Sequence, residues 1–64
     1  MKMTVNNLLN SCIGAYNNTI INIEDFDLTM EWSGKRELIP DSIANKLVVA
    51  FKVLDINMIY VVVK

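Results

Sequence analysis

Two β-prone runs decide the fold, Leu47-Val48-Val49-Ala50-Phe51-Lys52-Val53-Leu54 and Met58-Ile59-Tyr60-Val61-Val62-Val63, and they lie on either side of Asp55-Ile56-Asn57. Both runs are rich in β-branched and aromatic residues, which favour strands over helices. The polar residues between them fit a turn. We therefore expect strands at 47–54 and 58–63 that form a hairpin.

The register of this hairpin determines which side chains share a face, because a slip of one residue exchanges the two faces. An odd-length loop at 55–57 would pair Leu54 with Met58. One face would then be uniformly apolar and hold Val49, Phe51, Val53, Ile59, Val61 and Val63. The other would hold Val48, Ala50, Lys52, Leu54, Met58, Tyr60, Val62 and Lys64. A two-residue loop would put Lys52 beside Ile59 and mix both faces, so we favour the odd loop. The second face keeps an apolar surplus in either register, which a helix or another subunit could cover.

The N-terminal part of the chain predicts a short helix at 4–13. Thr4 is a good N-cap, and apolar residues follow it at the i, i+3, i+4 and i+7 positions, namely Val5, Leu8, Leu9 and Cys12. Gly14 stands where a left-handed C-cap is expected. So short a helix gains its stability by packing on a sheet.

Two more strands are expected between this helix and the closing hairpin. Thr19-Ile20-Ile21-Asn22-Ile23 predicts a strand at 19–24, and the strict alternation from Phe26 to Ser33 predicts its hairpin partner at 26–33. Ser33-Gly34-Lys35-Arg36 is interpreted as a turn. Pro40 suits the first turn of a helix, which we place at about 40–46.

These elements predict one α+β domain spanning 1–64. It has a four-stranded antiparallel sheet built from two hairpins, with the N-terminal helix packed on one face and a short helical turn between the hairpins. The strand order does not follow from the pattern.

Composition excludes several classes of function. The chain has 64 residues, no His, one Cys and two Gly, so a histidine-based triad, an internal disulfide and a glycine-rich phosphate loop are ruled out. No apolar run approaches the length of a membrane span, and a signal-peptide core is lacking, so we expect a cytoplasmic protein. The net charge of −1 argues against a nucleic-acid binder.

Apolar residues make up 53% of the chain, above the ordinary ~45–50% of globular domains. A domain of this size buries only ~60% of the surface that its unfolded chain exposes. We therefore expect a second copy or a partner protein to cover part of the apolar surface, and we predict a homodimer in which the closing hairpin contributes contact surface.

No cofactor, metal or catalytic residue is expected. Glu24, Asp25 and Asp27 place three carboxylates within four positions, which is compatible with a divalent metal but more typical of a solvated hairpin turn. Cys12 lies on the apolar face of the predicted helix, so we interpret it as a small buried hydrophobe rather than a nucleophile.

Six residues are the candidates for an interface: Trp32, Lys35, Arg36, Met58, Tyr60 and Val62. Trp32 ends the alternating strand and either caps the core or anchors a partner, since tryptophan is enriched in binding hot spots. Lys35 and Arg36 either contact a phosphate or a partner's carboxylate or are only solvated, as adjacent charges in a turn more often are. The other three belong to the second face of the closing hairpin. An alternative is a basic face that dimerisation builds for nucleic acid from Lys2, Lys35, Arg36, Lys46, Lys52 and Lys64.

The order of elements resembles that of a group of small proteins carried by phages and prophages of low-GC Gram-positive bacteria. In them an N-terminal helix precedes a strand pair, an aromatic-x-Gly-Lys turn, an Ile-Pro helical turn and a closing β-hairpin. The matching residues here are Met3-Thr4-Val5 with Leu8-Leu9, Thr19-Ile20-Ile21-Asn22-Ile23, Trp32-Ser33-Gly34-Lys35, Ile39-Pro40 with Ile43, Val49 with Phe51, and Asn57 with Tyr60 to Val63. The closing hairpin of the group usually has a more acidic, glycine-containing turn than Asp55-Ile56-Asn57.

The resemblance implies a phage accessory protein of the host cytoplasm. Proteins of this size often act stoichiometrically, and the sharpest version is an inhibitor that binds a host protein of a bacterial antiphage defence system. The alternatives are a nucleic-acid-associated phage regulator and a minor structural component of the virion.

Overall fold

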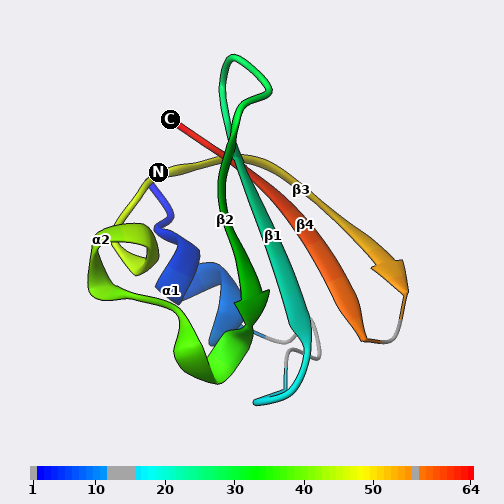
Figure 1. Ribbon diagram of the computed structural model, residues 1–64. Helices are drawn as coiled ribbons and strands as arrows, with labels where there is room; N and C mark the ends of the chain where they lie inside the picture. The colour runs from blue at the N-terminus through cyan, green and yellow to red at the C-terminus, as the bar shows by residue number, and fades with distance from the viewer. Residues whose placement is uncertain (1, 12–15, 56) are drawn as a thin grey trace.

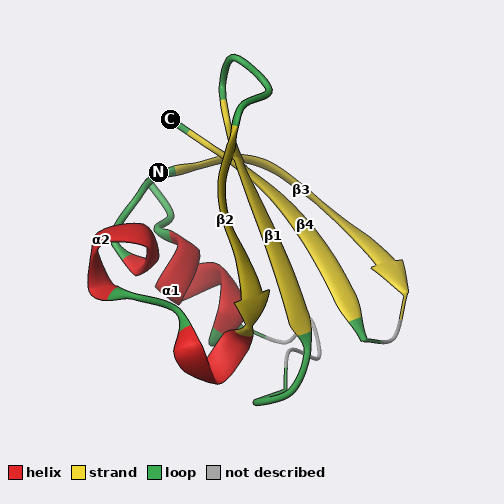
Figure 2. Cartoon of the chain, viewed as in Figure 1, coloured by secondary structure: helices red, strands yellow, loops and turns green. Residues whose placement is uncertain are grey.

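The structure is a computed structural model that describes residues 2–11, 16–55 and 57–64. A twisted four-stranded sheet has all of its helices on one face (Figures 1 and 2). In chain order the elements are α1 (Val5–Leu9), β1 (Ile20–Asp25), β2 (Met30–Lys35), a 3₁₀-helix (Arg36–Leu38), α2 (Asp41–Ala44), β3 (Val48–Asp55) and β4 (Met58–Val63). The α+β class is confirmed.

The sheet is mixed, so the prediction of a purely antiparallel sheet was wrong. The strand order is β2-β1-β4-β3, and β1 and β4 pair in parallel in the middle. Both hairpins are antiparallel as expected. Because each hairpin contributes one strand to the centre, the parallel pair arises from the way the hairpins dock side by side. This leaves β2 and β3 as the edge strands.

The closing hairpin has the predicted register over its middle. Lys52 pairs with Tyr60 and Phe51 with Val61, as expected from the odd loop. The register shifts at both ends, however, so Met58 pairs with Asp55 rather than with Leu54. At the other end Val48 lies opposite Val63 and packs against the core, a place that the uniform alternation had given to Val49.

The first hairpin turns later than predicted, and the strand expected at 26–33 is wrong in its first half. Asp25 controls the turn: its backbone N–H donates to Thr29 O at 2.9 Å, and its Oδ1 accepts from the N–H groups of Asp27 and Thr29 at 2.8 and 3.0 Å. Leu28 adopts a φ of 68°, the left-handed conformation that a tight turn requires. Phe26 and Leu28 therefore project into solvent instead of entering the core.

The turn predicted at 33–36 is also wrong, because Gly34 lies within β2 and Arg36 opens the 3₁₀-helix. The indole of Trp32 lies over Gly34. A Cβ at Gly34 would meet Trp32 Cζ2 at 3.0 Å, so the glycine makes room for the ring. This close approach, rather than a turn, explains the glycine.

The core lies between the helices and the inner side of β1 and β4. Its buried members are Val5, Leu8, Leu9, Ile21, Ile23, Ile43, Ile59, Val61 and Val63. Thr4 caps α1 as predicted: its hydroxyl accepts from Asn7 N, and the Asn7 side chain accepts from Thr4 N, both at 3.1 Å. The helical turn near Pro40 is confirmed as α2. The predicted helix 4–13 is shorter, and the expectations for Cys12 and Gly14 fall outside the described residues.

Candidate interaction surface

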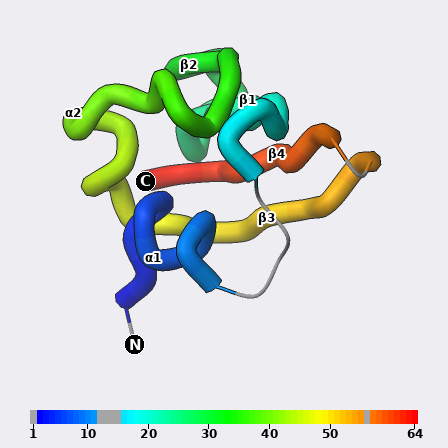
Figure 3. Tube along the Cα trace, turned by 90° about the horizontal axis from the view of Figure 1, so that it is seen from below, coloured from blue at the N-terminus to red at the C-terminus, as the bar shows by residue number. Residues whose placement is uncertain are grey.

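The outer face of the sheet carries no helix among the residues that the structure describes. Figure 3 shows α1 and α2 on the same side, against the inner face. The pairing of the strands assigns the opposite side chains to one surface, which we call the open face: Ile20, Asn22, Glu24, Ser33, Lys35, Ala50, Lys52, Met58, Tyr60 and Val62. This is the second face of the closing hairpin, extended across the whole sheet.

An apolar strip runs along β4 through the middle of the open face. Met58, Tyr60 and Val62 follow one another along this central strand, and Ile20 lies beside Met58 on β1. Met58 is exposed and the other three are half-buried. The three predicted interface residues of β4 are therefore neighbours on one solvent-facing surface.

Polar side chains surround this strip. Ser33 Oγ donates to Asn22 Oδ1 at 2.8 Å across the first hairpin. The hydroxyl of Tyr60 donates to the Glu24 carboxylate, and this bond raises the pKa of the phenol above its usual value of 10.0, with desolvation and the negative charge of Glu24 acting in the same direction. Lys52 lies directly opposite Tyr60 on β3. The strip thus has a rim that carries both signs of charge.

The six predicted interface residues do not form one surface. Lys35 joins the three β4 residues on the open face, opposite Ile20. Trp32 lies on the other side of the sheet, half-buried and packed against the core. The structure thus gives Trp32 the core-capping role that was one of its two predicted alternatives.

Arg36 is bound to the end of α1. Its Nη2 donates to Leu9 O at 3.4 Å and to Asn10 Oδ1 at 2.5 Å. Its Nε is buried and has no hydrogen-bond partner among the residues that the structure describes. Lys46 is also engaged, with its Nζ 3.4 Å from Glu31 Oε1. Two of the basic residues proposed for a nucleic-acid face, Arg36 and Lys46, thus contact other residues of the chain.

The three carboxylates predicted to be a turn or a metal site are divided by the structure. Glu24 lies on the open face with Tyr60, whereas Asp25 holds the turn through its Oδ1. Among residues 2–11, 16–55 and 57–64, no three His, Cys, Asp or Glu side chains are grouped to hold a metal ion.

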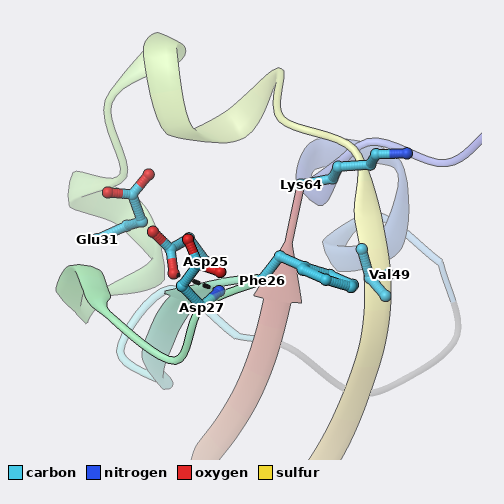
Figure 4. Close-up of a pocket in the computed structure, with 6 residues that line it drawn as sticks. All are labelled: Asp25, Phe26, Asp27, Glu31, Val49 and Lys64. Atoms are coloured by element: carbon cyan, nitrogen blue, oxygen red, sulfur yellow. Dashed lines mark hydrogen bonds between the residues drawn. The ribbon is translucent and has the colours of Figure 1, made fainter.

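A shallow hollow of about 620 Å³ lies at the end of the sheet beside this turn (Figure 4). In the close-up, the ring of Phe26 points toward Val49, and the carboxylates of Asp25 and Asp27 point the other way. The residues that line the hollow are Asp25, Phe26, Asp27, Glu31, Val49 and Lys64. Sequence reasoning missed this hollow because it placed Phe26 in a strand at 26–33 rather than in the turn.

The edge strand β3 is the second surface that the sequence did not reveal. All of its residues except Val48 are exposed, including Phe51 at 47% and Val53 at 50%. These two side chains belong to the inner face, opposite Val61 and Ile59, but lie at its margin. Only the strand order makes β3 an edge, and that order was not predictable from local pattern.

No helix in the described part of the chain is long and apolar enough to cross a membrane. A comparison of the chain with family models, with curated proteins and with solved structures finds no match.

Proposed function

We propose that this chain is an interaction protein that acts stoichiometrically by binding a protein of its host cell. The observation that carries the proposal is the open face, where an apolar strip on the central strand β4 faces solvent inside a polar rim. An apolar centre with a polar rim is the usual anatomy of a protein-binding surface. The absence of His and the single Cys in the sequence favour binding over catalysis as the mode of action.

In the absence of the host protein, the occupant that we propose for the open face is a second copy of the chain. Two such faces would bury Met58, Tyr60 and Val62 of each copy between two sheets, as the layers of a β-sandwich do. The rim holds Lys35 and Lys52 as well as Glu24, so that each copy offers charges of both signs to the other. The homodimer would thereby hide part of the apolar surplus.

The resemblance to phage accessory proteins supports a sharper form of the proposal. In that form the target is a component of a bacterial antiphage defence system, and the protein inhibits it by occupying a surface in the host cytoplasm. Blocking a surface requires shape and anchoring side chains but no reactive group.

The test uses light scattering of the wild-type protein and of Met58→Glu at micromolar concentration. We expect the wild type at twice the 7.3 kDa of one chain, and the variant as a monomer, because a carboxylate on the strip would be buried in the dimer without a partner. Leu38→Glu is the matched control, since Leu38 is exposed on the 3₁₀-helix. A wild-type species of one chain mass removes the dimer.

Binding to a host protein is tested separately by co-purification from host lysate with the wild type and with Val62→Glu, followed by mass spectrometry. We expect a host protein that the wild type and Leu38→Glu retain and that Val62→Glu loses. Recovery of the bait alone in all three contradicts the proposed function.

A further inference from the structure

The outer edge of β3 presents backbone groups that no strand in the described part of the chain pairs. Ile20 N donates to Asn57 O at 2.8 Å, and Lys64 N donates to Leu47 O at 3.0 Å. In a ladder, successive residues turn their N–H and C=O groups to opposite sides. The backbone groups of the even-numbered residues of β4 therefore point toward β3. On β3 they bond the backbone groups of Ala50 and Lys52.

The same alternation turns the N–H and C=O groups of Phe51 and Val53 away from β4, to the edge of the sheet. The beginning of this edge is already covered: Val48 N donates to Met3 O at 2.8 Å, and Val5 N donates to Lys46 O at 2.9 Å. As far as residues 2–11, 16–55 and 57–64 show, the uncovered part of the edge begins at Val49. It contains two apolar side chains at the margin of the core, with Lys52 between them on the open face.

We infer that this edge binds an extended segment of another protein as a fifth strand, and that the segment carries an acidic residue between two apolar ones. Backbone bonds to Phe51 and Val53 would supply affinity, as in other cases of strand addition. The apolar residues of the segment would lie beside these two side chains and extend the core. Its carboxylate would lie opposite the Lys52 ammonium, and opposite charges across a ladder stabilise the pair. The inference rests on the proposed function and names the segment of the host protein that is bound.

A second copy of the chain fits this edge poorly. Two β3 strands related by a two-fold axis pair a residue with its own copy at the centre. If the pairing is centred on Lys52, the outward backbone groups of both Phe51 and Val53 can bond those of the copy. This pairing, however, places two Lys52 ammonium groups directly opposite each other, which is destabilising. A register centred on Phe51 runs Leu54 of the copy onto Val48, where Met3 already lies. If the pairing is centred on Val53, only Val53 and its copy have backbone groups that point toward each other and can bond. Lys52 thus protects the edge from self-pairing, a common use of lysine on edge strands.

The test uses two synthetic peptides of alternating valine and threonine, acetylated and amidated, with either aspartate or lysine in place of the central threonine. Binding is followed by fluorescence anisotropy and by amide hydrogen exchange. We expect the aspartate peptide to bind wild-type protein about three- to tenfold more tightly than the lysine peptide, because the exchange replaces a repulsive pair by an attractive one. Lys52→Glu should reverse this preference. Lys35→Glu, the same change on the other edge strand, should leave it unaltered.

The amide hydrogen exchange measurement would show where on the sheet the peptide binds. We expect the peptide to protect the amides of Phe51 and Val53, whose N–H groups point outward. Val53→Pro removes one outward donor and leaves the ladder to β4 intact, so the variant should keep its circular dichroism spectrum and lose peptide binding.

Two results would overturn the inference: equal affinity for both peptides in wild type and Lys52→Glu, or a wild-type dimer that Val53→Pro converts to monomers. A dimer that Met58→Glu disrupts and Val53→Pro leaves intact supports the separate use of the edge. If neither peptide binds while the host protein still binds through the open face, the edge inference is wrong and the proposed function stands.

Discussion

Removing the Arg36 side chain should destabilise the fold without affecting partner binding. Arg36→Ala deletes the donors to Leu9 O and Asn10 Oδ1 at the C-terminal end of α1. Hydrogen bonds from a charged group contribute about 1.5–3 kcal/mol. Removal of the buried Nε, which has no partner in the described part of the chain, offsets part of this loss, so we expect a net cost of about 2 kcal/mol.

This cost is large for so small a protein. A domain of this length has a free energy of unfolding of about 3–10 kcal/mol. A loss of about 2 kcal/mol corresponds to a decrease in Tm of about 8–16 °C. Urea and thermal unfolding followed by circular dichroism measure both quantities, and Lys35→Ala, at the exposed neighbouring position, is the control, with an expected change below about 0.5 kcal/mol.

A double-mutant cycle with Asn10→Ala isolates the interaction. If Arg36 acts through Asn10, the two substitutions are not additive, and the coupling free energy is at least about 0.5 kcal/mol. Additive effects, or an Arg36→Ala protein as stable as Lys35→Ala, would refute the structural role. Loss of partner binding at unchanged stability would return Arg36 to the interface that the sequence predicted for it.

The remaining predictions concern the core, β2 and the open face. Ile23→Ala should cost about 2–5 kcal/mol in urea unfolding, because Ile23 is fully buried in the central strand pair; a cost below about 1 kcal/mol would contradict the assigned core. Gly34→Ala should cost about 1–3 kcal/mol and change the fluorescence of Trp32, since the added Cβ meets the indole ring; unchanged emission and stability would show that the ring lies elsewhere. The raised pKa of Tyr60 means that the folded state holds this proton more tightly than the unfolded state, so its contribution to stability is complete below pH 10.0 and decreases as pH rises through the raised value. The stability of Tyr60→Phe should therefore decrease less than that of the wild type above pH 10.0, and equal slopes would argue against the bond to Glu24.

Local pattern predicted the closing hairpin because its alternation places Lys52 and Tyr60 on one face and Phe51 and Val61 on the other. The same rule failed at Phe26 and Leu28. There, alternating apolar residues belong to a turn that the Asp25 carboxylate stabilises through two backbone N–H groups. Asp25, followed two positions later by Asp27, was the available signal for that turn. The alternation of apolar residues was given more weight than this signal.

The candidate surfaces divide in the same way. Met58, Tyr60 and Val62 share one solvent-facing strip because alternate residues of a strand lie on the same face. The sequence therefore indicated this strip. The β3 edge depends on which hairpin strands meet in the centre, and strand order is a property of long-range docking. The contacts of Arg36 were not predictable, because its hydrogen-bond partners lie far away in the sequence, at Leu9 and Asn10.

The parallel pairing of β1 and β4 has a consequence for the order of events during folding. Each hairpin closes over a short stretch of chain, whereas the central ladder joins segments separated by most of the sequence. Loop closure over that separation slows the step. We therefore expect the two hairpins to form early and their docking to limit the folding rate. Until β4 pairs with β1, the apolar side chains of each hairpin remain exposed to solvent.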